Sequence, residues 1–282
     1  MSARQLRRRI VSGFMTGLVA ALSAVAVLAL VLIFAYLVVK GSSSLDWNFF
    51  VRSPVPAGQT GGGVANAIVG TVLIVGLAGL IGLPIGIGTG LYLAEYGSGR
   101  LGWAVRFVAD VLNGTPSIVI GVFAWTWLVR PMGHFSALAG STALAMLMVP
   151  MLARTTEEMV RLVPHSLREA ALALGYARWR TSLRVVARTA LAGIVTGCLV
   201  GIARIAGETA PLLFTALGNL NFTTNVLQPM QALSLQIFVY GTGPFEEWHR
   251  LAWAAALVLM GLVLLLALAA RAAVRPRHGA AR

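Results

Sequence analysis

Several stretches of this chain carry no charged residue over a length that can cross a lipid bilayer, and this constrains the fold more than any other feature. Among them are Ile10–Val39, Val111–Val129 and Leu251–Ala270. About 20 apolar residues in a helix span the roughly 30 Å of hydrocarbon in a bilayer. Only 11% of the residues are charged, against about 25% in a typical soluble domain. These values exclude a soluble globular enzyme and a disordered chain, and they predict an all-α, polytopic membrane protein.

The basic residues fall between the apolar stretches in an alternating pattern. The chain has 21 Arg and one Lys; counted from the N-terminus, the odd-numbered gaps hold 17 of them and the even-numbered gaps hold four. Because positively charged loops stay in the cytoplasm, both termini are expected to be cytoplasmic. The net charge of +13 then reflects membrane topology. Nucleic acid is disfavoured as a partner, since a nucleic-acid-binding protein would gather its charge on one folded face.

Apolar run length and charge placement together predict six membrane spans. Their approximate bounds are residues 13–39, 66–94, 107–129, 134–153, 187–209 and 250–272. The first apolar run far exceeds the roughly 7–15 residues of a signal-peptide core, so it is expected to remain as an uncleaved anchor. Residues 1–63 would then hold a cytoplasmic tail, this anchor and a periplasmic connector. Residues 64–272 would form a compact permease core, and residues 273–282 a basic cytoplasmic tail.

Glycine and proline mark three departures from plain apolar helix. The connector of residues 41–63 is rich in turn residues, which argues against regular structure. Gly82, Gly86 and Gly90 share one face of the second span, which favours a packing seam for another helix over a direct role in transport. The sequence Asn-Gly-Thr-Pro-Ser at residues 113–117 interrupts the third span. It predicts either a broken helix that lines a cavity or an ordinary helix start displaced by a few residues.

The segment 154–186 is expected to be a cytoplasmic loop that forms a helix, a glycine turn and a second helix. Ser166 and Glu169 have the spacing of a capping box, and Gly175 is a natural helix stop. One apolar face would be formed by Leu167, Ala170, Ala171 and Leu174. The loop would either lie on anionic lipid headgroups or serve as a rigid knob for a cytoplasmic partner.

The residues of this loop resemble those of a known family. Glu169-Ala170-Ala171, followed after three residues by Gly175, is similar to the EAA loop of ABC-importer permeases. The resemblance implies a type I ABC-importer permease fold, in which this loop docks in a groove of the ATP-binding subunit. The family pattern continues nine residues later with Ile-x-Leu-Pro, where this chain has Val-Val-Ala-Arg at residues 185–188. Because this chain lacks that Leu and Pro, the pattern does not decide whether the helix bends here.

The sequence contains no pattern for catalysis. Lys40 is the single lysine, and it follows Tyr-Leu-Val-Val, so it cannot complete a phosphate-binding Walker A loop. The four histidines lack metal-ligand spacing, and no G-x-S-x-G sequence occurs. We therefore expect no enzyme activity, no metal and no cofactor in this chain, with ATP bound by a partner subunit.

A pair of opposite charges lies inside the fifth predicted span. Arg204 and Glu208 are four residues apart and would share a helix face. Arg204 lies 16 residues after Arg188, about 24 Å at 1.5 Å per residue. An arginine at that depth costs about 2.5–3.5 kcal/mol, so it should face protein or water and have a partner. The pair would either fix helix packing or provide a station for an anion, because guanidinium presents a planar fork to phosphate oxygens.

Residues 207–215 read Gly-Glu-Thr-Ala-Pro-Leu-Leu-Phe-Thr and resemble the signature of phosphate-specific permeases of the Pst system. Three other stretches agree with that family: Gly70-Thr71, Tyr-Leu-Ala-Glu-Tyr at 92–96, and Gly-Thr-Pro-Ser-Ile-Val-Ile-Gly at 114–121. The resemblance implies import of inorganic phosphate across the bacterial inner membrane. It also implies three partners, which are a sister permease (PstC-like), a dimer of ATP-binding subunits (PstB-like) and a periplasmic phosphate-binding protein (PstS-like).

The sequence thus predicts a permease subunit that carries phosphate but performs no chemistry. The expected pathway residues are Arg204 and Glu208, with Asn113, Thr115, Ser117 and Thr209 as weaker polar candidates. The expected coupling surface consists of Glu169, Ala170, Ala171 and Gly175. Two alternatives stay open: an importer of another oxyanion (sulfate, molybdate or phosphonate), and a stand-alone, ion-coupled anion transporter. A membrane-embedded hydrolase is disfavoured because a nucleophile–base pair is absent.

Overall fold

The computed structural model describes residues 3–56, 59 and 61–273, and every regular element within them is helical. In chain order the elements are α1 (Ala3–Gly41), η1 (Ser42–Ser44), α2 (Trp47–Val51), α3 (Ala65–Glu95), α4 (Arg100–Gly114), α5 (Ser117–Ala124), η2 (Trp125–Val129), α6 (Arg130–Met132), α7 (Ala137–Arg161), α8 (His165–Ala173), α9 (Arg178–Thr181), η3 (Ser182–Val186), α10 (Ala187–Thr189), α11 (Leu191–Ala206), α12 (Ala210–Thr215), α13 (Leu233–Gly241) and α14 (Glu246–Ala273). Beyond Ala273, the expected basic tail of 273–282 lies outside the described residues.

The described residues contain four helices long and apolar enough to cross a membrane, and six such units if each of two bent pairs is one span. The four are Arg7–Ser44, Ala65–Glu95, Ala137–Arg161 and Glu246–Ala272. The bent pairs are Arg100–Gly114 with Ser117–Met132, at 105°, and Arg178–Thr189 with Leu191–Ala206, at 70°. Each of the six predicted spans falls on one of these units, and the predicted all-α, polytopic fold is confirmed.

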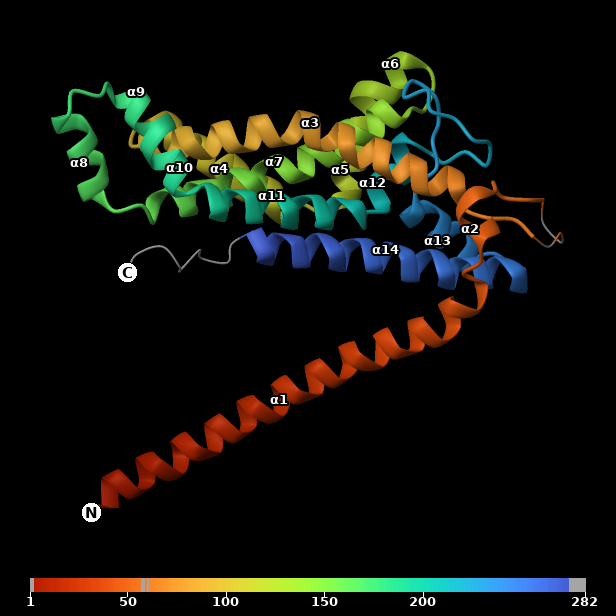
Figure 1. Cartoon of the computed structure of the whole chain (residues 1–282), viewed down its shortest axis with the longest axis horizontal. Coiled ribbons are helices and arrows are strands. Elements are labelled where there is room, and N and C mark those ends of the chain that lie inside the picture. Colours follow the sequence, from red (N-terminus) through yellow and green to blue (C-terminus); the bar gives the residue numbers. More distant parts are fainter. Residues whose placement is uncertain (1–2, 57–58, 60, 274–282) are drawn as a thin grey trace, which may run out of the picture.

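Helices α3, α7, α11 and α14 lie side by side (Figure 1). In α7, 61% of the apolar segment is buried inside the chain, against 33% in α3 and 17% in α14. One end of the bundle carries α8 and α9, and we call it the loop end; α2 and α6 lie at the opposite end (Figure 1). The main core consists of side chains from the long helices and from the segments after α11, among them Ile74, Leu144, Met148, Leu152, Ile205, Leu212 and Leu235.

Two stripes of glycine allow α3 and α11 to approach α7 closely. On α3, a β-carbon built at Gly86 would lie 2.7 Å from the Leu152 side chain, and one built at Gly90 would lie 2.5 Å from Thr156. Gly82 faces Met148 in the same way. The packing-seam interpretation of this stripe is therefore correct.

The second stripe lies on α11 and was not identified from the sequence. Its members are Gly193, Gly197 and Gly201, which face Met159, Thr155 and Met151 of α7. A β-carbon at Gly197 would lie 2.7 Å from the Thr155 side chain. Helix α7 is thus held between two small-residue faces, which lets backbones approach closely without help from the hydrophobic effect.

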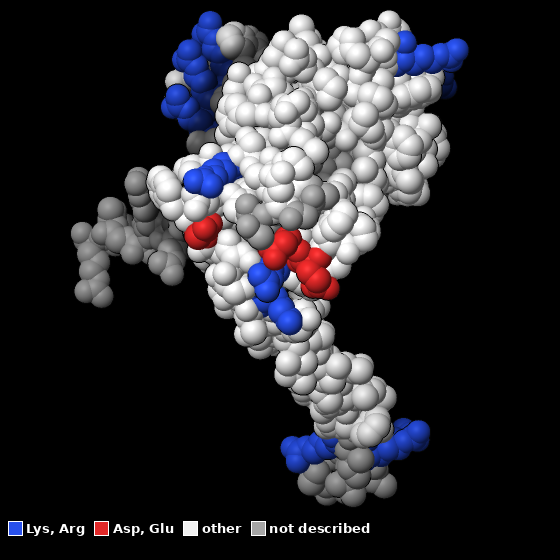
Figure 2. All heavy atoms as spheres, turned by 90° about the vertical axis from the view of Figure 1, so that its right-hand side faces the viewer, with Lys and Arg blue, Asp and Glu red and all other residues white. Residues whose placement is uncertain are grey.

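Helix α1 extends away from the other helices, and the C-terminal end of α1 contacts α14 (Figure 1). There Leu37 is buried, and the rings of Tyr36 and Trp253 pack edge to face at 5.3 Å. The apolar side chains along the rest of the helix are mostly exposed. Figure 2 shows that α1 is uncharged between its two ends and that basic side chains gather at its far end. Such a helix requires lipid or another protein around it.

The connector of residues 41–63 contains regular structure, which corrects the prediction. Helix α2 begins after Asp46, whose carboxylate accepts a hydrogen bond from the Phe49 backbone amide at 2.8 Å. Phe49 is fully buried against Val64, Ala67 and Leu233. A helix cap and one buried aromatic side chain therefore order a segment that its composition marks as turn-rich.

Two predicted span ends also differ from the structure. Helix α7 continues past residue 153 to Arg161, so the first part of the segment 154–186 is helical. Helix α11 ends at Ala206, short of the predicted residue 209. In α7, the charged residues continue the helix because they are paired with charges on α4.

Candidate functional site

Arg204 occupies the last turn of α11, and its side chain is largely exposed. The side chain is 60% exposed, and that of Glu208 is 20% exposed. The Arg204 Nε and Glu208 Oε1 atoms are 4.0 Å apart, at the outer limit of an ion pair. A second contact joins an Arg204 guanidinium nitrogen to Met151 Sδ at 3.9 Å. The guanidinium therefore keeps most of its donors available to another molecule.

Glu208 lies beyond the end of α11, so the expected shared helix face is only partly formed. The helix ends at Ala206, and the Glu208 amide bonds to the Ile205 carbonyl at 3.2 Å. The Glu208 carbonyl accepts a hydrogen bond from Ser234 Oγ at 2.9 Å, which ties this turn to α13. The backbone of Glu208 is fixed while its carboxylate stays half-buried beside Arg204.

Residues 113–117 form a true break, as one of the two open interpretations predicts. Helix α4 ends at Gly114, α5 begins at Ser117, and the two units are bent by 105°. Thr115 uses its hydroxyl locally, donating to the Val111 carbonyl at 2.8 Å. Asn113 is exposed, and Ser117 is half-buried.

The bend directs α5 against α12, the helix that follows Glu208. A β-carbon at Gly121 would lie 2.7 Å from Pro211 Cα, so the two backbones are in contact. Thr209 caps α12, where its carbonyl accepts a hydrogen bond from the Leu213 amide at 3.2 Å. Across residues 3–56, 59 and 61–273, no hydrogen bond or ion pair joins Arg204 to Asn113, Thr115 or Ser117.

The predicted coupling residues lie on and after α8 at the loop end. Glu169, Ala170 and Gly175 are exposed, and Ala171 is buried. Gly175 has φ +78°, the left-handed conformation that glycine adopts without strain. The Gly175 amide bonds to Leu172 O at 3.0 Å, and the Tyr176 amide bonds to Ala171 O at 3.1 Å. This is a Schellman C-cap, so Gly175 ends the helix as predicted.

Two details of the loop differ from expectation. The predicted capping box is wrong: Pro164 precedes the first helical residue, and Ser166 lies inside the first turn without a capping bond. The helix starts earlier because the Pro164 carbonyl already accepts a hydrogen bond from Leu167. The helix is bent here although the chain lacks the Leu and Pro of the family pattern. The units on either side of Ala190 are bent by 70°.

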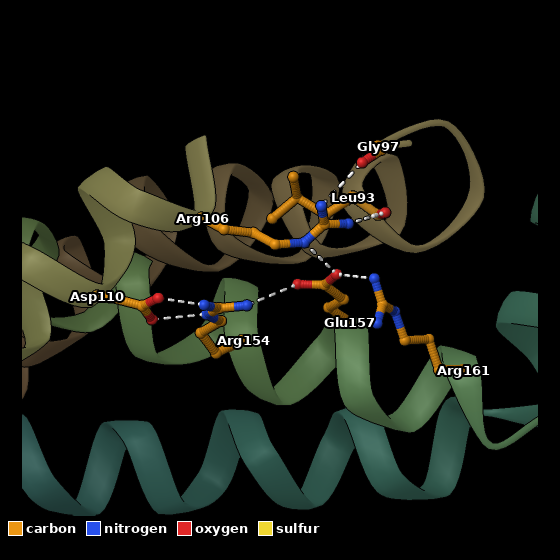
Figure 3. Close-up of polar contacts among 7 residues, drawn as sticks. All are labelled: Leu93, Gly97, Arg106, Asp110, Arg154, Glu157 and Arg161. Carbon is orange, nitrogen blue, oxygen red and sulfur yellow. Dashed lines mark hydrogen bonds and ion pairs between the residues drawn. The ribbon is translucent and has the colours of Figure 1, made fainter. Parts of the chain in front are cut away.

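A cluster of charged side chains joins α4 to α7 near the loop end (Figure 3). Glu157 lies at its centre and is 2% exposed. Its Oε1 atom is 2.7 Å from Arg106 Nε and 2.7 Å from an Arg161 guanidinium nitrogen. Its Oε2 atom is 3.3 Å from Arg154, which also forms a two-bond contact with Asp110 of α4. We call these five residues the α4–α7 charge cluster.

Arg106 extends this cluster to the end of α3. Its two terminal nitrogens donate to the carbonyls of Gly97 and Leu93, each at 2.8 Å (Figure 3). These carbonyls belong to the last turn of α3 and the residues after it, where helical partners are missing. In the sequence, Arg106 and Arg154 indicate membrane topology and no specific contact. Their signal was the spacing Arg106–Asp110 and Arg154–Glu157–Arg161, which places opposite charges on one face of each helix.

The chain matches the family described as "Binding-protein-dependent transport system inner membrane component" over residues 86–278. It is 48% identical over 237 residues to the phosphate transport system permease protein PstA of Yersinia pestis, a match that covers 83% of this chain and 80% of the relative. It is 46% identical over 238 residues to PstA of Xylella fastidiosa (84% and 83% covered), and 38% identical over 271 residues to PstA 1 of Mycobacterium tuberculosis (94% and 89% covered).

A comparison with solved structures supports the same fold for this chain. A chain of the MetNI methionine ABC transporter in an inward-facing conformation superposes with a TM-score of 0.63 at 20% identity. The match covers 75% of this chain and 96% of that one. The ABC-importer permease fold that the EAA resemblance implied is therefore confirmed. The chain belongs to the family of inner-membrane components of binding-protein-dependent transport systems.

Proposed function

We propose that this chain is the permease subunit of an ATP-driven importer that carries inorganic phosphate across the inner membrane. The observation that carries this function is the exposed guanidinium of Arg204 in a membrane helix. The relatives of this chain in Yersinia pestis and Xylella fastidiosa are named phosphate transport system permease proteins. A planar guanidinium is suited to bidentate hydrogen bonds with phosphate oxygens.

The exposure of Arg204 also supports a second permease beside this one. An arginine facing lipid at the centre of a span costs about 2.5–3.5 kcal/mol on the insertion scale. Glu208, at 4.0 Å, offsets only part of that cost. A sister permease (PstC-like) that covers this face would leave a polar pathway between the two subunits. Thr209, Asn113, Thr115 and Ser117 are secondary candidates for that pathway, through the turn before α12 and the α4–α5 break.

The cytoplasmic partner in this proposal is a dimer of ATP-binding subunits (PstB-like). The supporting features are the exposed Glu169, Ala170 and Gly175 at the loop end and the rigid turn after α8. This chain transports without catalysing a reaction, and a periplasmic phosphate-binding protein (PstS-like) delivers the substrate. In this proposal both termini lie in the cytoplasm, which is supported by the concentration of basic residues in the odd-numbered gaps.

The experiment compares two arginines of similar exposure in the complete importer. Arg204 is 60% exposed and faces Glu208 at 4.0 Å, while Arg250 is 67% exposed and faces Glu247 at 3.6 Å. Arg204→Ala is expected to reduce phosphate uptake into proteoliposomes to background, with the three partners still co-purifying. Arg250→Ala is expected to leave uptake unchanged.

Three outcomes would contradict the proposal. Normal uptake by Arg204→Ala would remove Arg204 from the pathway. Uptake of phosphate by this chain alone, without ATP, would show a stand-alone transporter. Uptake of sulfate or molybdate in preference to phosphate by the complete importer would show that the substrate is another oxyanion.

A further inference from the structure

Glu95 is the last residue of α3, and its chemistry is unusual for that position. A carboxylate at a helix C-terminus faces the negative end of the helix dipole, so it does not favour the helix that carries it. Its side chain is nevertheless 7% exposed. Glu95 belongs to the Tyr-Leu-Ala-Glu-Tyr stretch at residues 92–96, to which the proposed function assigns no role.

Every polar oxygen of Glu95 accepts a hydrogen bond from the cytoplasmic loop. Oε1 accepts from Arg168 Nε of α8 at 3.1 Å, and Oε2 accepts from Ser182 Oγ of η3 at 2.9 Å. The Glu95 carbonyl accepts from an Arg178 terminal nitrogen of α9 at 2.8 Å. One residue of α3 therefore holds three successive elements of the loop.

Arg168 connects α8 to the end of α7 as well. Beyond its bond to Glu95, its guanidinium donates to the backbone carbonyls of Val160, at 2.9 Å, and of Val163. These carbonyls lie in and just after the last turn of α7, where helical acceptors lack partners. Arg168 and Glu95 thus join the ends of α3 and α7 to α8.

Apolar packing does little to fix α8 within this chain. Leu167, Leu172 and Leu174 are 40%, 48% and 79% exposed. A hollow of about 730 Å³ lies beside α8 and is lined in part by Glu95, Arg168 and Leu172. The position of α8 relative to the bundle is therefore set mainly by the hydrogen bonds of Arg168 to Glu95, Val160 and Val163, supported by Ala171.

We propose that Glu95 is a positioning residue that transmits movement of α8 to α3, an inference that rests on the proposed docking of an ATPase at the loop. Displacement of α8 pulls on Glu95 through Arg168. Helix α3 passes the movement to α7 through the glycine seam at Gly86 and Gly90. Without the Glu95 carboxylate, α8 still presents its docking surface and keeps the bonds of Arg168 to α7, but it loses its direct link to α3.

The test uses Glu95→Gln in the complete importer, with Glu158→Gln as the matched control, because Glu158 is an exposed glutamate near the same end of the bundle. We expect Glu95→Gln to keep the ATPase bound and to keep its rate of ATP hydrolysis. Phosphate uptake should fall by about tenfold, since hydrogen bonds to a charged group are the stronger class. The number of ATP molecules hydrolysed per phosphate imported should rise by the same factor. The KM for phosphate and the amount of ATPase in the complex should remain those of the native importer, a pattern that general loss of structure would not give.

Rescue by a conservative variant provides a second measurement. Glu95→Asp keeps the charge and is expected to recover part of the coupling. Ser182→Ala removes one donor, leaves the carboxylate, and should uncouple more weakly; it serves as the test if Glu95→Gln does not accumulate. A normal ATP-to-phosphate ratio in these variants would overturn the inference, as would loss of the ATPase from the complex. Failure of the native importer to take up phosphate would instead overturn the proposed function.

Discussion

Arg106 of α4 and Glu157 of α7 form the central contact of the α4–α7 charge cluster, with Nε and Oε1 2.7 Å apart (Figure 3). The Glu157 side chain is 3% exposed and the Arg106 side chain is 21% exposed. Three arginines surround this single carboxylate, and Arg154 alone has a second carboxylate, that of Asp110. Glu157 therefore balances the positive charge of three arginines at the contact between α4 and α7.

Glu157→Gln is expected to lower the thermal stability of the purified importer. The change leaves Arg106 and Arg161 without their carboxylate partner at a largely buried position. Removing one partner of a buried pair costs about 3–5 kcal/mol, and the exposure of Arg161 reduces this to about 1–3 kcal/mol here. The measurement is the Tm of the detergent-solubilised complex.

Glu158→Gln is the control for this prediction, because it makes the same chemical change on the next residue, whose side chain is exposed. It should leave the Tm unchanged. Equal shifts of Tm in the two variants would show that the cluster does not stabilise the fold.

The membrane spans could be predicted because their signal is local. The apolar run ends where charged or turn residues begin, so the predicted span 66–94 differs from α3 by one residue at each end. The same criterion placed the end of the fourth span too early, at residue 153. There Arg154 continues the helix, since its partners Asp110 and Glu157 satisfy its charge.

The charged contacts between helices could not be predicted, because their partners are far apart along the chain. Arg106 and Glu157 are 51 residues apart, Arg154 and Asp110 are 44 apart, and Glu95 and Arg168 are 73 apart. Periodicity within one helix says which face a charge occupies but not which helix covers it. Arg204 could be proposed as a candidate pathway residue from the sequence, because a charge inside an apolar run is conspicuous without knowledge of its neighbours.

The glycine seam between α3 and α7 leads to a prediction with an internal control. A methyl group at Gly86 would lie 2.7 Å from the Leu152 side chain and 3.2 Å from the Val149 carbonyl oxygen, whereas one at Gly88 would meet nothing within 4 Å. Gly86→Ala should therefore destabilise the subunit by about 1–3 kcal/mol, the usual range for overpacking. Gly88→Ala should be neutral. The amount of subunit in the membrane and the Tm of the complex measure both, and equal behaviour of the two variants would argue against the seam.

Substitution of Gly175 is expected to impair uptake because of the backbone conformation at this position and not because space is lacking. A β-carbon there meets nothing within 4 Å, but φ is +78°. The left-handed conformation costs a side-chain-bearing residue about 1–2 kcal/mol, and asparagine tolerates it better than most. Gly175→Ala and Gly175→Leu should impair uptake to a similar extent, with Gly175→Asn closer to the native chain. Uptake by the reconstituted importer gives the ranking. If Gly175→Asn were as impaired as Gly175→Leu, contact with the ATPase and not the turn would be the cause.

The contact between α5 and α12 connects the helix break to the turn that carries Glu208. A methyl group at Gly121 would lie 2.7 Å from Pro211 Cα and 3.3 Å from the Pro211 carbonyl oxygen. Because these atoms belong to the backbone, Gly121→Ala must move α12 away from α5, and we expect a stability loss of about 1–3 kcal/mol together with reduced phosphate uptake. Gly114→Ala is the matched control from the same motif, since a methyl group there meets nothing within 4 Å. Normal uptake and Tm in Gly121→Ala would mean that the spacing of α5 and α12 does not control the turn beside Arg204.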